Sequence, residues 1–87
     1  MKLSQEEISA TIKEYILNRF VKANEKNVLT NETPLISGGI IDSILTMQLV
    51  VFIEETYNFE FLPHEVDKEN LNTIASITAF IVKKING

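Results

Sequence analysis

The chain has 87 residues, 45% of them hydrophobic, which is enough for one small domain with a modest core. Its formal net charge of −4 disfavours binding to nucleic acid, and the lack of cysteine excludes a disulfide framework, a thiolate metal site and a cysteine nucleophile. No apolar run approaches the length of a membrane span, and no signal peptide is evident at the N-terminus. We therefore expect a soluble, cytoplasmic monomer with a single domain over residues 1–87.

The first predicted helix covers residues 5–21. Ser4 and Glu7 have the spacing of a capping box, in which each side chain accepts a hydrogen bond from the other residue's backbone N–H. Leu3 and Ile8 flank the cap and are expected to form a hydrophobic staple. Apolar residues then recur at helical spacing on the face expected to point into the core: Ile8, Ile12, Tyr15, Ile16 and Phe20.

The helical pattern fails between residues 22 and 41. Asparagine, threonine, proline and glycine crowd this segment, and all of them favour turns. A connection of this length is unusual in so small a domain and is often functional. Apolar side chains interrupt the polar ones: Val28, Leu29, Leu35, Ile36, Ile40 and Ile41. We therefore expect an ordered loop held against the helix ends, with one helical turn after Pro34.

The second predicted helix covers residues 43–57, with Asp42 as its N-cap. One face has the pattern of a core face: Thr46, Leu49, Val50, Ile53 and Tyr57. The opposite face carries aliphatic side chains with carboxylates at its edge: Ile44, Met47, Gln48, Val51, Glu54 and Glu55. An exposed apolar stripe with a charged rim indicates a docking surface for another protein. The alternative is that the long loop covers these residues.

The C-terminal part of the chain predicts a short helix and a final long one. Phe59, Phe61 and Leu62 are expected to supply core contacts from the connection over residues 58–64. Asp67 is expected to cap a single turn over residues 68–71, and Thr73 to cap the last helix. Isoleucines repeat along the inner face of that helix: Ile74, Ile77, Ile81 and Ile85. Three main helices, a short third helix and a long first loop predict an all-α four-helix bundle.

The sequence offers little for catalysis. His64 is the only histidine, and no serine lies near it in the sequence, so no orienting partner can be named. The acidic residues of the C-terminal half lack the alternating spacing and the glycine of a calcium loop. We therefore expect a protein that is not an enzyme and has no metal site.

The stretch from Gly38 to Ile44 joins the long loop to the second helix. Its two glycines permit a tight or left-handed backbone path, and its isoleucines anchor that path to the core. Ser43 then stands at the start of a helix, where free N–H groups and the helix dipole favour an anion such as phosphate. Ser43 is either an ordinary first-turn residue or the attachment point of a phosphate-linked group.

The chain resembles the acyl carrier proteins, a family of four-helix bundles that accept 4′-phosphopantetheine, over nearly its whole length. Residues 40–44, Ile-Ile-Asp-Ser-Ile, resemble the family motif whose serine carries the arm. Three other segments resemble the family: residues 31–35 before the motif, residues 54–57 at the end of the second helix, and residues 69–74 around the third and fourth helices.

The resemblance implies that a separate phosphopantetheinyl transferase attaches a covalent 4′-phosphopantetheine to Ser43, and that Asp42 caps the helix and takes part in transferase recognition. The thiol of the arm would hold an acyl or aminoacyl group as a thioester. An activating ligase and downstream synthase or transferase enzymes would contact the predicted docking surface: Ile44, Met47, Gln48, Val51, Glu54 and Glu55.

Two positions depart from the family pattern. Leu45 stands where fatty-acid carriers often have an acidic residue, and Gln48 replaces a common glutamate. Charge attraction should therefore contribute less to the docking of partner enzymes than it does in fatty-acid carriers. This favours a carrier for a specialised pathway of polyketide, nonribosomal peptide or fatty acid type. The alternatives are a D-alanyl carrier for cell-wall polymers and, from another class, an unmodified helical adaptor that only docks to other proteins.

Overall fold

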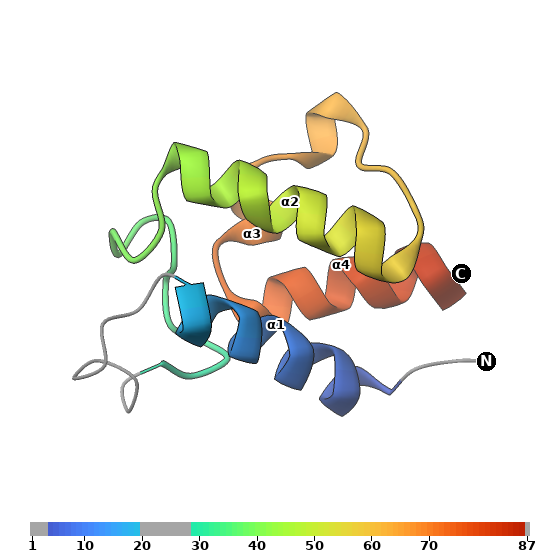
Figure 1. The fold of residues 1–87 in the computed structure, drawn as a ribbon, viewed down its shortest axis with the longest axis horizontal. Helices are drawn as coiled ribbons and strands as arrows, with labels where there is room; N and C mark the ends of the chain where they lie inside the picture. The colour runs from blue at the N-terminus through green and yellow to red at the C-terminus, as the bar shows by residue number, and fades with distance from the viewer. Residues whose placement is uncertain (1–3, 20–28, 87) are drawn as a thin grey trace.

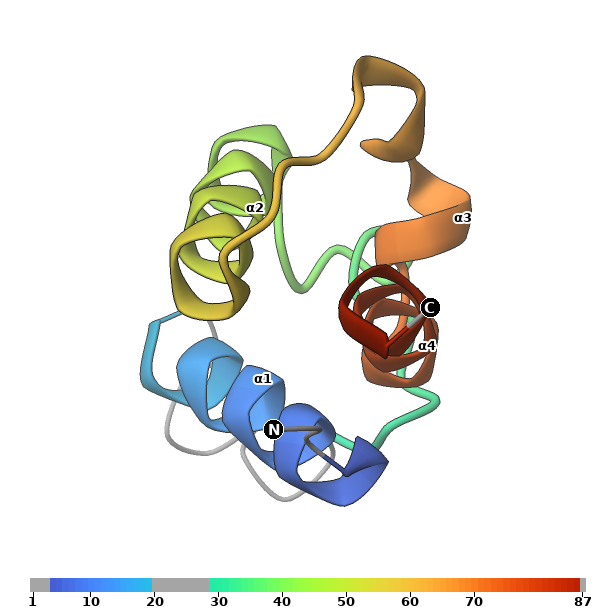
Figure 2. The ribbon, with the colours of Figure 1, turned by 90° about the vertical axis from the view of Figure 1, so that its right-hand side faces the viewer.

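Three main helices form the framework of the computed structural model, which describes residues 4–19 and 29–86. They are α1 (Gln5–Arg19), α2 (Ser43–Tyr57) and α4 (Ile74–Asn86). Two short elements lie between α2 and α4, the 3-10 helix η2 (Pro63–Glu65) and α3 (Lys68–Leu71). In Figure 1, α2 runs above α1 and α4, and the end-on view of Figure 2 shows the three main helices on three sides of the molecule. The predicted all-α fold is confirmed, with the long connection between α1 and α2.

α1 begins at the predicted capping box. The Ser4 N–H donates to Glu7 Oε1 at 3.1 Å, and the Glu7 N–H donates to Ser4 Oγ at 3.1 Å. Its inner face buries three isoleucines completely: Ile8, Ile12 and Ile16. Leu3 and Phe20, which were also predicted to pack here, lie outside the described residues, as does the predicted end of the helix at residue 21.

The core is almost entirely aliphatic and is drawn from the helices and the loop before α2. α1 and α3 both pack against α4. The loop contributes Leu29, Leu35 and Ile41, and α4 contributes Ile74, Ile77 and Ile81. Burying an aliphatic side chain of this size stabilises a fold by about 1.5–3 kcal/mol. Over residues 29–41 these apolar side chains hold the loop against the helices, as predicted, while Val28 lies outside the described residues.

Aromatic side chains join α2 to α1. The rings of Tyr15 and Phe52 stack with their centroids 3.9 Å apart. At the other end of α2, burial raises the pKa of the Tyr57 phenol, and a hydrogen bond with Thr11 partly opposes that rise. These two contacts hold α2 against α1.

The connection from α2 to η2 differs from the prediction at one residue. Phe59 and Phe61 are half-buried and pack against Phe80 of α4, with the rings of Phe61 and Phe80 stacked at 4.8 Å. Leu62 was predicted to supply a core contact, but 49% of it is exposed, so that prediction was wrong. The two phenylalanines already cover Phe80, and Leu62 lies outside them at the start of the 3-10 turn.

Glu65 links η2 to the last turn of α4. Lys84 Nζ lies 2.8 Å from Glu65 Oε2, and the Leu62 N–H donates to Glu65 Oε1 at 2.8 Å. The hydrogen bond from Lys84 and the one from the Leu62 backbone both favour the ionised carboxyl, so the pKa of Glu65 is lowered from its ordinary value of 4.5.

This lowered pKa predicts a pH effect on stability. A carboxyl with a lowered folded pKa stabilises the fold above its unfolded pKa, and the stabilisation is lost as the pH falls through the folded value. We expect Glu65→Gln to remove this component, so that unfolding free energy falls less steeply than in the wild type between about pH 5 and pH 3. Urea unfolding across a pH series measures this, with Glu60→Gln, at an exposed site, as the control. An unchanged slope in Glu65→Gln would contradict the prediction.

Each helix in the described part of the chain is too short or too polar to cross a membrane.

Candidate functional site

The turn before α2 depends on its two glycines. The Gly38 N–H donates to the Pro34 carbonyl at 3.1 Å and closes a hydrogen-bonded turn at the place where one helical turn was predicted. A Cβ at Gly38 would overlap that carbonyl oxygen, so a larger residue would force the backbone to move. Gly39 has a φ of +76°, a left-handed conformation that favours glycine. The Ile41 N–H then donates to the Leu35 carbonyl at 3.0 Å and brings the chain to the start of α2.

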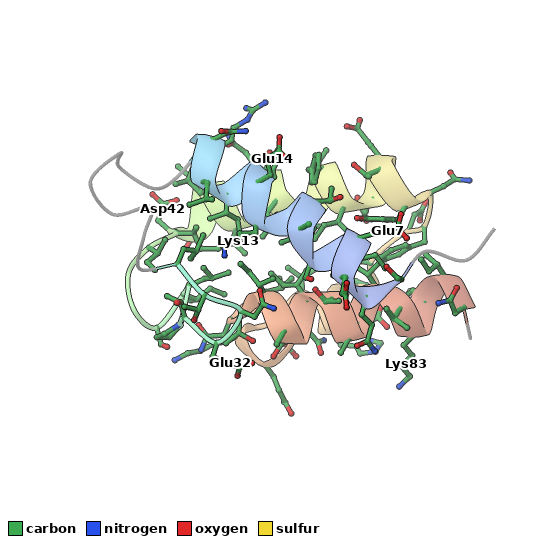
Figure 3. All side chains as sticks on the ribbon, turned by 90° about the horizontal axis from the view of Figure 1, so that it is seen from below. Glu7, Lys13, Glu14, Glu32, Asp42 and Lys83 are labelled. Carbon is green, nitrogen blue, oxygen red and sulfur yellow. The ribbon has the colours of Figure 1, made fainter. Side chains whose placement is uncertain are left out.

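Asp42 is the N-cap of α2, as predicted. Its backbone is extended, and its Oδ1 accepts a hydrogen bond from the Leu45 N–H at 2.8 Å. Its carbonyl accepts from the Thr46 N–H at 2.8 Å and from Thr46 Oγ1 at 2.6 Å. Figure 3 shows Asp42 at the end of the molecule away from Glu7 and Lys83. The role of Asp42 in transferase recognition stays a prediction.

The cap geometry predicts the effect of replacing Asp42. Asp42→Ala removes the acceptor for a first-turn N–H and should lower the unfolding free energy by about 1 kcal/mol. In a domain of this size that corresponds to roughly 4–8 °C in melting temperature. Asp42→Ser restores a good capping oxygen and should melt close to the wild type. If the serine variant loses as much as the alanine variant, capping is not what Asp42 contributes.

Ser43 is the first residue of α2, and its side chain is exposed. Its hydroxyl has no hydrogen bond to any residue that the structure describes. The first N–H groups of a helix lack partners within the helix and, together with the dipole, attract negative charge. A nucleophilic oxygen that is free to react and a nearby set of amide donors suit the covalent attachment of a phosphate-linked group.

The predicted docking face of α2 is exposed along its apolar stripe. Ile44 is 71% exposed, Met47 51% and Val51 48%. The core face on the other side is confirmed, since it buries Leu49, Val50 and Ile53. The part of the loop over residues 29–41 does not cover the stripe. We call Ile44, Met47 and Val51 the α2 stripe.

The polar members of the predicted docking surface divide into two groups. Gln48 and Glu55 are exposed beside the α2 stripe. Glu54 is half-buried, and its Oε2 accepts a hydrogen bond from the Phe61 N–H at 2.8 Å. Glu54 therefore holds the connection that follows α2, a local role that the helical wheel could not indicate.

Two open grooves border the α2 stripe. One, of about 420 Å³, lies against α1: Tyr15, Arg19, Met47, Gln48, Val51, Phe52 and Glu55. The other, of about 480 Å³, lies beside Ser43: Ile36, Ile41, Asp42, Ser43, Thr46, Met47, Val66, Asp67, Lys68 and Leu71. We call the second one the Ser43 groove. Both volumes are within the range of about 300–1,000 Å³ that small-molecule sites occupy. The sequence did not indicate that Val66 and Lys68 lie near Ser43, because only tertiary packing brings them there.

A scan of the sequence against models of known protein families finds no match, and a search of curated proteins finds no significant relative. The fold and the site together define a small all-helical domain with an exposed serine at a helix start, next to an apolar face.

Proposed function

We propose that this chain is a carrier protein of the acyl-carrier type, which holds acyl or aminoacyl intermediates as thioesters on a 4′-phosphopantetheine arm at Ser43. The observation that carries the proposal is the exposed hydroxyl at the first residue of α2, directly after a capped turn. The resemblance of residues 40–44 to the carrier motif supports the same assignment, and so does the exposed α2 stripe beside it.

In the attachment reaction the chain supplies the serine oxygen, and the transferase supplies the catalytic groups. The Ser43 oxygen forms the new bond to the phosphorus of the phosphopantetheine group of coenzyme A. The bond from that phosphorus to the bridging oxygen of the diphosphate breaks, and the nucleotide part of coenzyme A leaves with that oxygen on its own phosphate. The transferase takes up the hydroxyl proton. A phosphodiester at the start of α2 is stabilised by the helix dipole by about 0.3–1 kcal/mol. When bound, the arm supplies a thiol that forms the thioester.

The α2 stripe would be the contact surface for the enzymes that load and use the carrier. It is apolar, with Glu55 as an exposed carboxylate at its edge. Leu45 is half-buried against the core, so the acidic residue common at this position in fatty-acid carriers is replaced by a packing residue. Docking should depend mainly on apolar contact, and we infer a specialised pathway of polyketide, nonribosomal peptide or fatty acid type.

The stripe gives a testable prediction about partner enzymes. Ile44→Ser should raise the KM of a partner enzyme for the carrier about tenfold, since a central apolar contact contributes about 1–2 kcal/mol to docking. Its melting temperature should stay close to the wild type because Ile44 is exposed. Leu62→Ser is the matched control, since Leu62 is an exposed aliphatic residue of the same size as Ile44 but lies outside α2. Equal effects of the two variants on KM would contradict the assignment of the stripe.

The proposal is tested by incubating the purified chain with coenzyme A and a transferase that accepts many carriers. Intact-protein mass spectrometry should show the addition of one phosphopantetheine group. An unchanged mass, under conditions in which a known carrier is fully modified, would overturn the proposal and leave the unmodified adaptor as the better hypothesis.

A further inference from the structure

Asn72, which lies between α3 and α4, holds the turn that leads to Ser43. Its Oδ1 accepts hydrogen bonds from the Ile36 N–H at 2.9 Å and the Ser37 N–H at 3.0 Å. Its backbone carbonyl accepts from the Leu35 N–H at 2.6 Å. Its own N–H donates to the Lys68 carbonyl at 2.9 Å, at the end of α3. One residue therefore binds three successive amides of the loop while it also ends α3.

Both polar atoms of the Asn72 side chain make hydrogen bonds to the loop. Asn72 Nδ2 donates to Ser37 Oγ at 3.1 Å, while Oδ1 accepts from the two loop amides. The Ser37 hydroxyl also lies 3.4 Å from Oδ1, as a donor, so the acceptor oxygen of Asn72 is the atom that all three loop donors share. The same loop makes a second contact with α4, in which the Ala75 N–H donates to the Asn31 carbonyl at 2.9 Å.

The contacts of Asn72 continue through hydrogen bonds to Ile41, two residues before Ser43. Leu35 is bound at its N–H by the backbone carbonyl of Asn72, and the next two amides by the Asn72 side chain. The Leu35 carbonyl accepts from the Ile40 N–H at 2.9 Å and the Ile41 N–H at 3.0 Å. Ile41 is buried and directly precedes the cap, Asp42. The position of the cap is thus set by a turn whose first half is bound to Asn72.

Asn72 also joins the two walls of the Ser43 groove. Ile36 and Ile41 line the groove on the loop side, and Val66 and Leu71 line it on the α3 side. Asn72 follows Leu71 in the chain and holds the Ile36 amide. The hydrogen bonds of Asn72 therefore tie the wall that contains α3 to the turn that presents the serine.

We propose that Asn72 is a positioning residue for Ser43: it keeps the turn over residues 35–41 in the arrangement that offers the Ser43 hydroxyl to the modifying transferase. The inference rests on the proposed function of Ser43 and adds a residue to that site which neither touches the hydroxyl nor lies near it in the sequence.

The expected effect differs from simple destabilisation. Ser37 is exposed and Ile36 half-buried, so water can bind both amides when the Asn72 side chain is shortened. The chain stays folded, but its turn adopts further arrangements, and only a fraction of molecules offers Ser43 correctly. The KM of the transferase for the carrier then rises by the inverse of that fraction while kcat is unchanged.

Three variants test the inference through the steady-state kinetics of phosphopantetheine transfer and the hydrogen exchange of the Ile36 and Ser37 amides. Asn72→Ala should raise KM about tenfold, as for a competent fraction of roughly one tenth, and should speed the exchange of both amides. Asn72→Asp keeps an acceptor for the two amides and should restore most of the wild-type KM. Ser4→Ala, which removes the cap of α1, should lower the melting temperature but leave KM unchanged.

A wild-type KM in Asn72→Ala, an equal rise in Ser4→Ala, or unchanged exchange of the two amides would overturn the inference while leaving the proposed function intact. A wild-type chain that the transferase does not modify would instead overturn the proposed function, and this inference with it.

Discussion

Ser43→Ala is expected to abolish the attachment of phosphopantetheine completely, because it removes the oxygen that forms the bond to phosphorus. The effect is on the chemistry alone. Ser43 is exposed and its hydroxyl has no hydrogen bond to a described residue, so the unfolding free energy should change by less than about 0.5 kcal/mol. Intact-protein mass spectrometry after incubation with transferase and coenzyme A measures the loss, and thermal unfolding monitored by circular dichroism checks the fold.

Ser4 provides the matched control for this variant. It is also an exposed serine at a helix start, where it caps α1 through the Glu7 N–H. Ser4→Ala should therefore be modified as fully as the wild type, although it is less stable. Residual modification of Ser43→Ala on another residue would contradict the assignment of the site.

Ile77→Ala is expected to lower the unfolding free energy by about 2–5 kcal/mol. Ile77 lies on the inner face of α4 and has no exposed surface, so the truncation removes buried methyl groups and leaves a cavity. Small domains have unfolding free energies of about 5–15 kcal/mol, and this chain is short enough to lie near the lower end. The loss would leave a measurable fraction of the variant unfolded near physiological temperature.

Ile44→Ala makes the same chemical change at an exposed position, since Ile44 is 71% exposed. Its unfolding free energy should stay within about 0.5 kcal/mol of the wild type. Urea unfolding of the two variants, side by side, measures the difference. Similar losses in both would contradict the division of isoleucines between the core and the α2 stripe.

The helices could be predicted because their signals are local. Ser4, Asp42, Asp67 and Thr73 each cap the helix that the sequence indicated, and for α4 the Ser76 N–H donates to Thr73 Oγ1 at 3.0 Å. Such caps depend on residues three or four positions apart, and so does the apolar periodicity. The exposed face of α2 could be predicted for the same reason, since both of its faces are visible in the helical wheel.

The contacts that were missed depend on tertiary packing. Asn72 and Ile36 are 36 positions apart, and no local pattern distinguishes an asparagine that holds a distant loop from one that only precedes a cap. Leucine is usually a core residue, so its side chain alone predicted burial for Leu62. In the fold, Phe59 and Phe61 make the contact with Phe80 instead. The α3 side of the Ser43 groove likewise forms only when the chain folds back on itself.

The number of thiols per chain tests the central claim most directly, because the chain contains no cysteine. The unmodified protein should show no reaction with a thiol reagent. After treatment with coenzyme A and a broadly active transferase, followed by removal of the free coenzyme, we predict one reactive thiol per chain. No reactive thiol after that treatment, with a known carrier fully labelled in parallel, would contradict the proposal that Ser43 carries a phosphopantetheine arm.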